Sequence, residues 1–174
     1  MDISFLGNNP EKLIAIYCNK QNPDRFLVGC LVAYDLHCLV LSLLTSNAHT
    51  DGLCLCASPD VFRIEFDSQY LLKLEEKRSQ STHPLWTGDP WAVFWNYAKE
   101  MKLIVQIKRR SSKQALYGFC VEYNENAIVV QRIRCNGTVQ REYSLRRGDI
   151  LLAVCESTTE KSVQKKYLRR VQNA

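Results

Sequence analysis

The residues of this sequence that could do chemistry are mainly cationic, and they gather in its second half. Residues 1–88 carry 7 Lys and Arg against 10 Asp and Glu, a net charge of −3, whereas residues 89–174 carry 16 against 8, a net charge of +8. Lys and Arg side chains bind phosphate groups, and each contact adds affinity that falls with salt. The asymmetry favours a polyanionic partner, with RNA or DNA as the first candidates, over the alternative of a merely solvated surface.

The basic side chains form three clusters that are candidate phosphate contacts. In chain order the clusters are Lys108, Arg109 and Arg110 with Lys113; Arg132, Arg134 and Arg141 around Asn136-Gly137; and Lys165, Lys166, Arg169 and Arg170. Two aromatic residues nearby, Tyr117 and Tyr143, could stack on bases. The alternative is that the first cluster is a solvated loop and the third the wet face of a helix.

Little in the sequence indicates an enzyme or a metal site. His37, His49 and His83 fall in a turn, a loop and a linker without a local catalytic partner, and no glycine-rich phosphate loop occurs. The 8 cysteines include no Cys-x-x-Cys pair, and Cys54 and Cys56 share one strand face, which is a poor start for tetrahedral zinc. We therefore expect no catalytic residues, no metal and no cofactor, with cysteine thiols filling the core.

Membrane insertion and export are not indicated. No apolar run approaches the roughly 20 residues of a spanning helix. The N-terminus has no basic residue ahead of an apolar stretch, so it does not resemble a signal peptide. The prediction is a cytoplasmic protein without a membrane partner.

The chain carries an internal repeat. Gly29 to Ser68 aligns without a gap on Gly118 to Ser157, and the order of apolar blocks and turns is the same in both stretches. The identical pairs include Gly29 with Gly118 and Asp60 with Asp149. Duplication of one ancestral unit is the better explanation of this pattern.

Each repeat is predicted to form five strands, because β-branched and aromatic residues alternate with turn formers. The predicted strands are 12–19, 25–35, 37–45, 53–57 and 61–66, then 102–109, 115–124, 127–134, 138–145 and 150–155. A helix is predicted over 90–100, with Trp91, Phe94, Trp95 and Ala98 on one packing face. The predicted domains are 1–77 and 89–174, joined by a linker over 78–88.

Two sequence stretches carry a resemblance to the Sm-like superfamily, which includes Sm, Lsm and Hfq proteins. The stretch from Gly29 to Asp35, repeated from Gly118 to Asn124, is similar to the first Sm motif, in which a glycine bends the second strand. Leu145 to Leu151, with Arg147-Gly148, resembles the second motif. The resemblance covers nearly the whole chain. It implies a mostly β fold of two tandem five-stranded Sm-like (SH3-type) small β-barrels, the second preceded by a short N-terminal helix.

In this family, the turn after the second strand and the turn before the fifth strand bind oligonucleotides. By position, the resemblance implies Asp35, Asn124 and Arg147 as RNA-binding residues. The sequence departs from the family where the motif's Asn falls on or near the apolar Leu39 and Ile128, and the first repeat lacks the Arg. RNA contacts elsewhere on the basic half are therefore also expected, and these candidates are Lys108, Arg109, Arg110, Arg132 and Arg134.

The functional prediction is an Sm-like RNA-binding protein, with a regulatory role left open, whose basic second repeat makes most contacts. The alternative is an Sm-like protein-interaction or assembly module that binds no nucleic acid. Self-association into a ring or dimer through strand edges is expected in either case, since Sm-like rings close by pairing the fourth strand of one subunit with the fifth of the next. Leu152 and Val154 make the last strand apolar on both faces, so it needs a cover.

Overall fold

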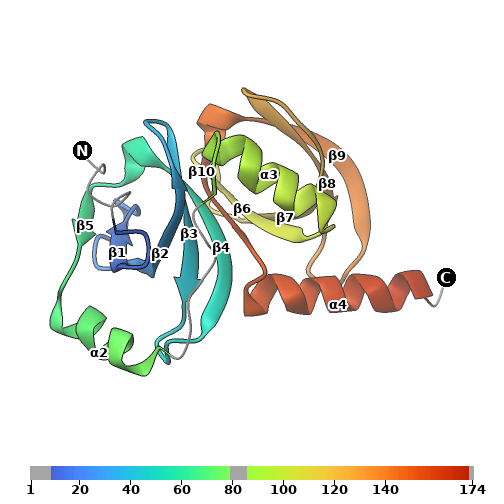
Figure 1. Cartoon of the computed structure of the whole chain (residues 1–174). Coiled ribbons are helices and arrows are strands. Elements are labelled where there is room, and N and C mark those ends of the chain that lie inside the picture. The colour runs from blue at the N-terminus through green and yellow to red at the C-terminus, as the bar shows by residue number, and fades with distance from the viewer. Residues whose placement is uncertain (1–8, 79–85, 173–174) are drawn as a thin grey trace. The chain divides into compact units, whose positions relative to one another are not determined.

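A computed structural model describes residues 9–78 and 86–172 of the chain, without the side chains of 158–160. The chain divides into two compact units, Met1–Pro90 and Trp91–Ala174, which we describe separately (Figure 1). Most of the linker predicted over 78–88, namely residues 79–85, lies outside the described residues.

The first unit is one antiparallel sheet and a helix. Its strands are β1 (Leu13–Tyr17), β2 (Leu27–Tyr34), β3 (Cys38–Leu44), β4 (Thr50–Ala57) and β5 (Arg63–Glu65), with the short helical turn η1 (Ser58–Asp60) before β5. They pair in the order β5-β1-β2-β3-β4. Helix α2 (Gln69–Lys77) begins at Ser68, whose hydroxyl accepts a hydrogen bond from the Leu71 amide at 3.3 Å, as an N-cap does.

The second unit repeats this order behind a leading helix. Helix α3 (Pro90–Glu100) lies where the sequence predicts a helix. It is followed by β6 (Ile104–Arg109), β7 (Leu116–Tyr123), β8 (Ala127–Ile133), β9 (Val139–Arg146), η2 (Arg147–Asp149), β10 (Ile150–Cys155) and α4 (Thr158–Gln172). The strands pair in the order β10-β6-β7-β8-β9. Each of the ten predicted strands overlaps an observed one.

The structural repeat is closer than the sequence repeat. Strands β2, β3 and β4 recur as β7, β8 and β9 with both ends of each strand shifted by 89 residues, as from Leu27 to Leu116. The register irregularity between Leu31 and Ala33 of β2 recurs between Cys120 and Glu122 of β7. Pairing irregularities and turns are not dictated by strand propensity, so their recurrence supports duplication strongly.

The mostly β class predicted from the sequence is confirmed. Among the described residues of the first unit, β4 and β5 end the strand order and do not pair with each other; β9 and β10 stand in the same relation in the second unit. The sheet is therefore an open ladder in each unit, and hydrogen bonding does not close the predicted barrel.

The two second-strand glycines are required by close packing. A Cβ atom at Gly29 would lie 2.2 Å from the carbonyl oxygen of Ser42 on the neighbouring strand. At Gly118 it would lie 2.2 Å from the Val130 side chain and 2.6 Å from the Gln131 carbonyl oxygen. All three distances are shorter than van der Waals contact, so the strands approach here in a way that only glycine permits.

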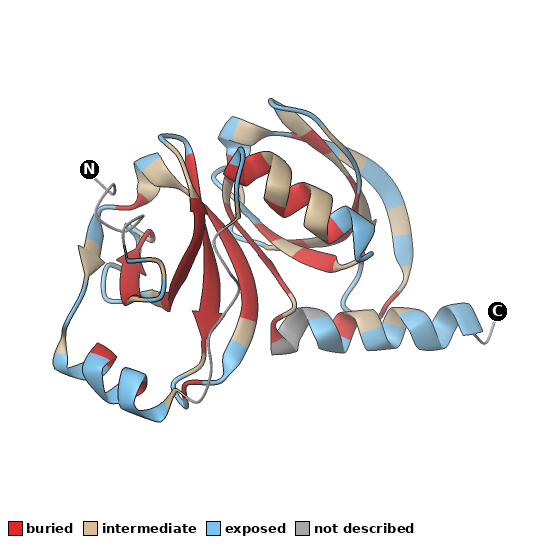
Figure 2. Ribbon diagram, viewed as in Figure 1, coloured by how far each residue is buried: buried red, intermediate tan, exposed pale blue. Residues whose placement is uncertain are grey.

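Apolar side chains from the strands and helices form the interior (Figure 2). In the first unit, α2 contributes Leu71 and Leu74 to a cluster with residues of β1, β2 and β3. In the second, Val163 of α4 packs with Ile104 and Ile133. All 8 cysteines are outside disulfides and 7 of them are buried, as predicted from the composition. Among the described residues, no helix is long and apolar enough to cross a membrane.

Candidate nucleic-acid interface

The β8–β9 hairpin is built around a tight turn at Asn136-Gly137. The Gly137 amide donates to the carbonyl of Arg134 at 2.8 Å, and the Arg134 amide donates to the carbonyl of Thr138 at 2.9 Å. Gly137 has a φ of +85°, a conformation that glycine adopts without strain. The Asn136 side-chain oxygen accepts from both the amide and the hydroxyl of Thr138. This bonding fixes the turn and therefore the positions of the basic side chains beside it.

Two arginines converge on one tyrosine along the hairpin. Arg132 on β8 donates from Nη1 to the Tyr143 hydroxyl at 3.3 Å, and its guanidinium carbon lies 5.6 Å from the ring centroid. The guanidinium carbon of Arg141, on β9, lies 5.0 Å from the same centroid. Both distances are in the range of cation–π contact. With exposed Arg134 at the turn, these residues form what we call the arginine–tyrosine patch: Arg132, Arg134, Arg141 and Tyr143.

The arginines change the acidity of the tyrosine. Hydrogen bonds from Arg141 and then Arg132 lower the pKa of Tyr143 below its usual value of 10, because both cations stabilise the phenolate. The same geometry holds the two guanidinium groups over one ring. Phosphate and base recognition both gain from such pre-positioning, since less side-chain freedom is lost on binding.

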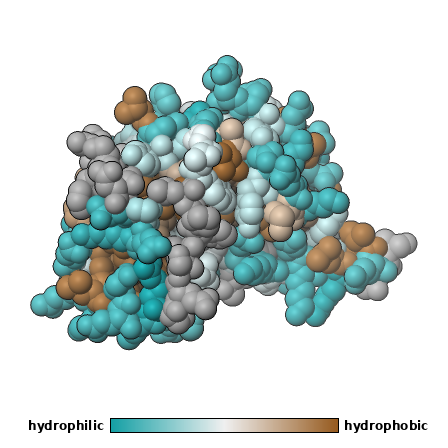
Figure 3. All heavy atoms as spheres, in the orientation of Figure 1, coloured by the Kyte–Doolittle hydropathy of each residue, from teal (hydrophilic) through white to brown (hydrophobic). Residues whose placement is uncertain are grey.

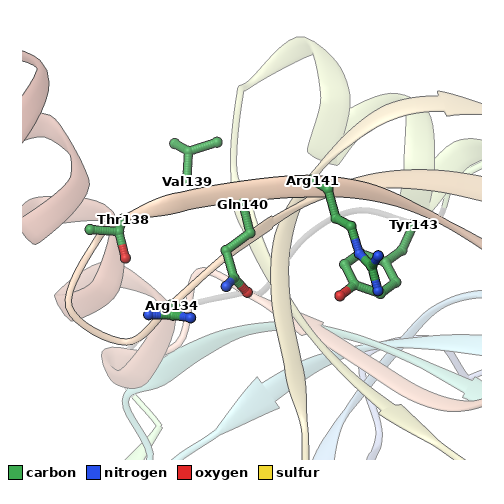
Figure 4. A pocket seen from close by; sticks show the side chains of 6 residues that line it. All are labelled: Arg134, Thr138, Val139, Gln140, Arg141 and Tyr143. Carbon is green, nitrogen blue, oxygen red and sulfur yellow. The ribbon is translucent and has the colours of Figure 1, made fainter.

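The patch borders a shallow open depression of about 640 Å³ (Figure 4). Its lining adds Thr138, Val139 and Gln140 to Arg134, Arg141 and Tyr143. Figure 4 shows Arg141 alongside the Tyr143 ring, and Val139 on the opposite side of β9 from Gln140. Amide, hydroxyl and guanidinium donors thus share one concave surface with an aromatic ring.

The positive charge of the patch is not neutralised by local carboxylates. Among the described residues, no carboxylate forms an ion pair with Arg132, Arg134 or Arg141, in contrast to pairs such as Lys12 with Asp67 and Arg78 with Glu75 in the first unit. Glu142 lies between Arg141 and Tyr143 in the sequence, and strand alternation directs it to the other face of β9. The field of the patch therefore attracts anions.

The turns that the Sm-like resemblance singles out have mainly structural roles. The Asp35 side-chain oxygen accepts from the amides of His37 and Cys38, both at 2.7 Å. The Asn124 side-chain oxygen accepts in the same way from Asn126 at 2.8 Å and Ala127 at 2.9 Å. Both side chains thus cap their own turns, a local geometry that Asp and Asn favour.

The structure brings Asn124 and Arg147 together through Trp91, which the sequence analysis assigned to packing. The buried Trp91 indole donates to the Asn124 carbonyl at 2.7 Å. The Arg147 guanidinium lies 5.1 Å from the Trp91 ring centroid and donates to the Glu125 carbonyl at 3.4 Å. In the first unit, Ser58 occupies the position equivalent to Arg147, and its hydroxyl donates to the Asp35 carbonyl at 3.3 Å.

The Lys108-Arg109-Arg110 cluster is not part of the patch. Arg110 donates from Nε to the Gly148 carbonyl at 2.8 Å, beside the η2 turn. Lys108 is exposed, and Arg109 is half-buried with a buried Nε that has no hydrogen-bond partner among the described residues. The cluster therefore does not form one surface: Arg110 is held beside the η2 turn, Lys108 faces solvent and Arg109 is half-buried.

Sequence reasoning found the arginines of the patch but not the whole surface. It grouped Arg132, Arg134 and Arg141 around the hairpin and named Tyr143 as a stacking residue nearby, but it did not predict that the arginines converge on Tyr143, and it missed Thr138 and Gln140. The available signal was strand alternation: positions 141 and 143 share a face of β9, and Tyr143 pairs with Val130, two residues before Arg132.

One group of side chains has the atom types of a cation site. Ligand atoms of Asp35, Cys38 and Asp89 lie within 4.8 Å of one another. The Asp35 oxygen that caps the turn is already bonded to two amides, however. We assign no metal to this group.

No family model, no curated protein and no solved structure matches this chain. The geometry of the second unit is therefore the basis for a functional conclusion.

Proposed function

We propose that the chain is an Sm-like protein and that its second unit binds single-stranded RNA through the arginine–tyrosine patch. The observation that carries the binding proposal is the convergence of Arg132 and Arg141 on Tyr143, with no ion pair to a carboxylate of the described residues. Arginines supply phosphate contacts and the aromatic ring supplies a base-stacking surface, the combination that single-strand binding requires.

Three features support the Sm-like part of the proposal. Each unit has five antiparallel strands, a second-strand glycine at a point of close strand approach, and a short helical turn between its fourth and fifth strands. In the second unit that turn carries Arg147-Gly148 and follows a leading helix. The finer form of this proposal is two tandem five-stranded units of the Sm-like type, whose ladders are open in hydrogen bonding.

Asn124 and Arg147 contribute less than the patch in this proposal. The Asn124 acceptor is occupied by its own turn, and the Arg147 guanidinium is stacked on Trp91 and bonded to the Glu125 carbonyl. A phosphate would have to compete with these contacts. Among the described residues, no backbone carbonyl competes with a phosphate for the patch arginines. These arginines therefore carry more of the affinity.

Self-association through strand edges is the second candidate, and the β9 edge argues against it there. Among the described residues of the second unit, β9 pairs with β8 alone, and its exposed residues include Arg141, Glu142 and Arg146. Charged side chains on an edge strand oppose edge-to-edge pairing. RNA binding is therefore the better-supported function of this hairpin.

Fluorescence anisotropy with a labelled single-stranded RNA tests the proposal. The double variant Arg132→Gln/Arg141→Gln is expected to bind at least about tenfold more weakly, a loss of about 1.4 kcal/mol. Arg146→Gln is the matched control, because this residue lies on the same strand, is exposed and does not line the depression. Equal weakening by the control, or no binding by the unaltered protein, would reject the patch as the RNA site.

A further inference from the structure

The C-terminal helix lies against the hairpin turn beside the proposed RNA-binding patch. Helix α4 carries the exposed residues Lys161, Lys165, Lys166, Arg169 and Arg170, and residues 161–172 include no Asp or Glu. Figure 2 shows the helix mostly exposed, and Figure 3 shows it hydrophilic apart from atoms near its C-terminal end.

Close backbone contact holds the hairpin turn against α4. A Cβ atom at Gly137 would lie 2.7 Å from the Tyr167 amide nitrogen and 2.8 Å from the Lys166 carbonyl carbon. Arg170 donates from Nε to the Asn136 carbonyl at 2.8 Å. The turn that positions Arg134 and Thr138 is therefore in direct contact with the basic helix.

The rest of the second unit fixes α4 in this place. The rings of Tyr167 and Phe119 pack edge-on with centroids 5.0 Å apart, and Val163 is buried with Ile104 and Ile133. Gln164 donates to the Lys102 carbonyl at 3.1 Å. These contacts use one face of the helix and leave Lys161, Lys165 and Arg169 on the other.

The charges of that outer face are arranged unfavourably for an isolated helix. Lys161, Lys165 and Arg169 follow one another at intervals of four residues, so like charges are neighbours on the helix surface. Together with Gln164 and Leu168, they line a shallow depression with a volume of about 390 Å³. A bound polyanion would relieve their repulsion, which gives the arrangement a physical use.

We propose that α4 and the β8–β9 hairpin form one continuous basic strip that binds a single RNA strand along its length. The inference rests on the proposed function and extends the RNA contacts from the arginine–tyrosine patch to α4. Thr138 to Tyr143 covers about 17 Å of strand, and Lys161 to Arg170 about 14 Å of helix. At roughly 3.4 Å per phosphate of a stacked strand, the strip accommodates about nine nucleotides.

An anionic membrane surface is the competing partner for a basic helix. Its exposed apolar residues are few: Leu168 is 49% and Val171 is 56% exposed. Insertion into a bilayer surface depends on a broad apolar face, and two of the apolar side chains of α4, Val163 and Tyr167, are already packed against the strands of the second unit. The continuity of α4 with the patch also favours an extended strand over a flat surface.

Comparing the affinities for a short and a long RNA distinguishes binding along the whole strip from binding at the patch alone. The test uses single-stranded RNA of about 4 and about 12 nucleotides, within and beyond the reach of one binding surface. The variant is Lys161→Gln/Lys165→Gln/Arg169→Gln. The control is Lys99→Gln/Lys113→Gln/Arg146→Gln, which removes the same charge from exposed positions outside α4. Circular dichroism checks that the helix remains.

The strip predicts that the α4 variant loses at least about tenfold affinity for the longer RNA and that its salt slope falls by about 2, at roughly 0.7 per lost contact. The shorter RNA should bind it normally. Equal losses for both lengths, an equal loss in the control, or no loss would overturn the strip while leaving the patch intact. If neither RNA binds the unaltered protein, the proposed function and the strip fail together. Binding to phosphatidylserine vesicles that the longer RNA does not displace would assign α4 to membranes instead.

Discussion

Arg132 on β8 donates a hydrogen bond from Nη1 to the hydroxyl oxygen of Tyr143 on β9, across 3.3 Å. Arg141 approaches the same ring from the same strand as Tyr143, with 5.0 Å between its guanidinium carbon and the ring centroid. The tyrosine therefore orders both cations without neutralising them, as long as its hydroxyl stays protonated. The proposed RNA binding should therefore depend on pH.

RNA affinity is predicted to fall with rising pH as Tyr143 ionises, at a pH below the usual tyrosine pKa of 10. Its pKa is lowered by Arg141 and Arg132, so the phenolate forms at a lower pH than in a free tyrosine. The negative phenolate repels phosphate and competes for both guanidinium groups. Anisotropy titrations at increasing pH measure the effect. Tyr143→Phe keeps the ring and removes the ionisation, so its affinity should depend less on pH; equal dependence in both proteins would contradict the role of Tyr143.

Gly137→Ala is predicted to destabilise the protein by about 1–3 kcal/mol. The added Cβ meets the backbone of α4 at 2.7 Å, and the φ of +85° disfavours any residue with a side chain. Gly148→Ala is the matched control, because nothing lies within 4 Å of its Cβ position. Urea denaturation gives both values. A Gly137→Ala variant as stable as Gly148→Ala would mean that the hairpin and α4 are not in this contact.

Much of this hairpin and its sheet could be predicted from the sequence, because the signals are local. Alternating β-branched residues and the Asn136-Gly137 turn define β8 and β9 without knowledge of distant contacts. The bend glycines, Gly29 and Gly118, were recognised for the same reason. The open ladders could not be predicted, since strand propensity does not determine which strand edges remain unpaired.

The candidate site was only partly predictable, because its geometry depends on contacts between separate elements. Asp35 and Asn124 have the residue types of a binding site, but their side-chain oxygens cap turns in the structure. The contact between Trp91 and Arg147 joins residues far apart in the sequence. The docking of Gly137 on α4 likewise has no local signal other than the glycine itself.

The Tyr97 hydroxyl is predicted to make stability fall at alkaline pH. It donates to Glu156 at 3.0 Å, and burial followed by the charge of Glu156 raises the pKa of Tyr97 to about 12 from its usual 10. The folded state therefore holds this proton more tightly than the unfolded state, and the stabilisation is present below pH 10 and lost between about pH 10 and pH 12.

Tyr97→Phe isolates this contribution. Its loss of the hydrogen bond should cost about 1 kcal/mol at neutral pH. The difference in unfolding free energy between the two proteins should shrink as the pH rises through that window, as measured by urea denaturation at each pH. A constant difference would show that the Tyr97 proton does not contribute.

Thiol labelling is predicted to select Cys135. It is exposed, whereas the other 7 cysteines are buried. Burial also raises the pKa of Cys120 to about 11, which keeps its thiol protonated and unreactive near neutrality. Ellman's reagent should therefore modify one thiol per folded chain, and Cys135→Ser should abolish the fast reaction. Rapid modification of several thiols in the native protein would be inconsistent with the buried core.

The salt dependence of RNA binding tests the central claim most directly. The logarithm of the association constant for a single-stranded RNA, plotted against the logarithm of salt concentration, has a slope of about −0.7 for each phosphate contact. The arginine–tyrosine patch predicts a clearly negative slope for the unaltered protein. In Arg132→Gln/Arg141→Gln it predicts a slope smaller in magnitude by about 1.4, together with weaker binding. An unchanged slope in the double variant, or affinity that does not respond to salt, would contradict the claim that these two arginines hold the RNA backbone.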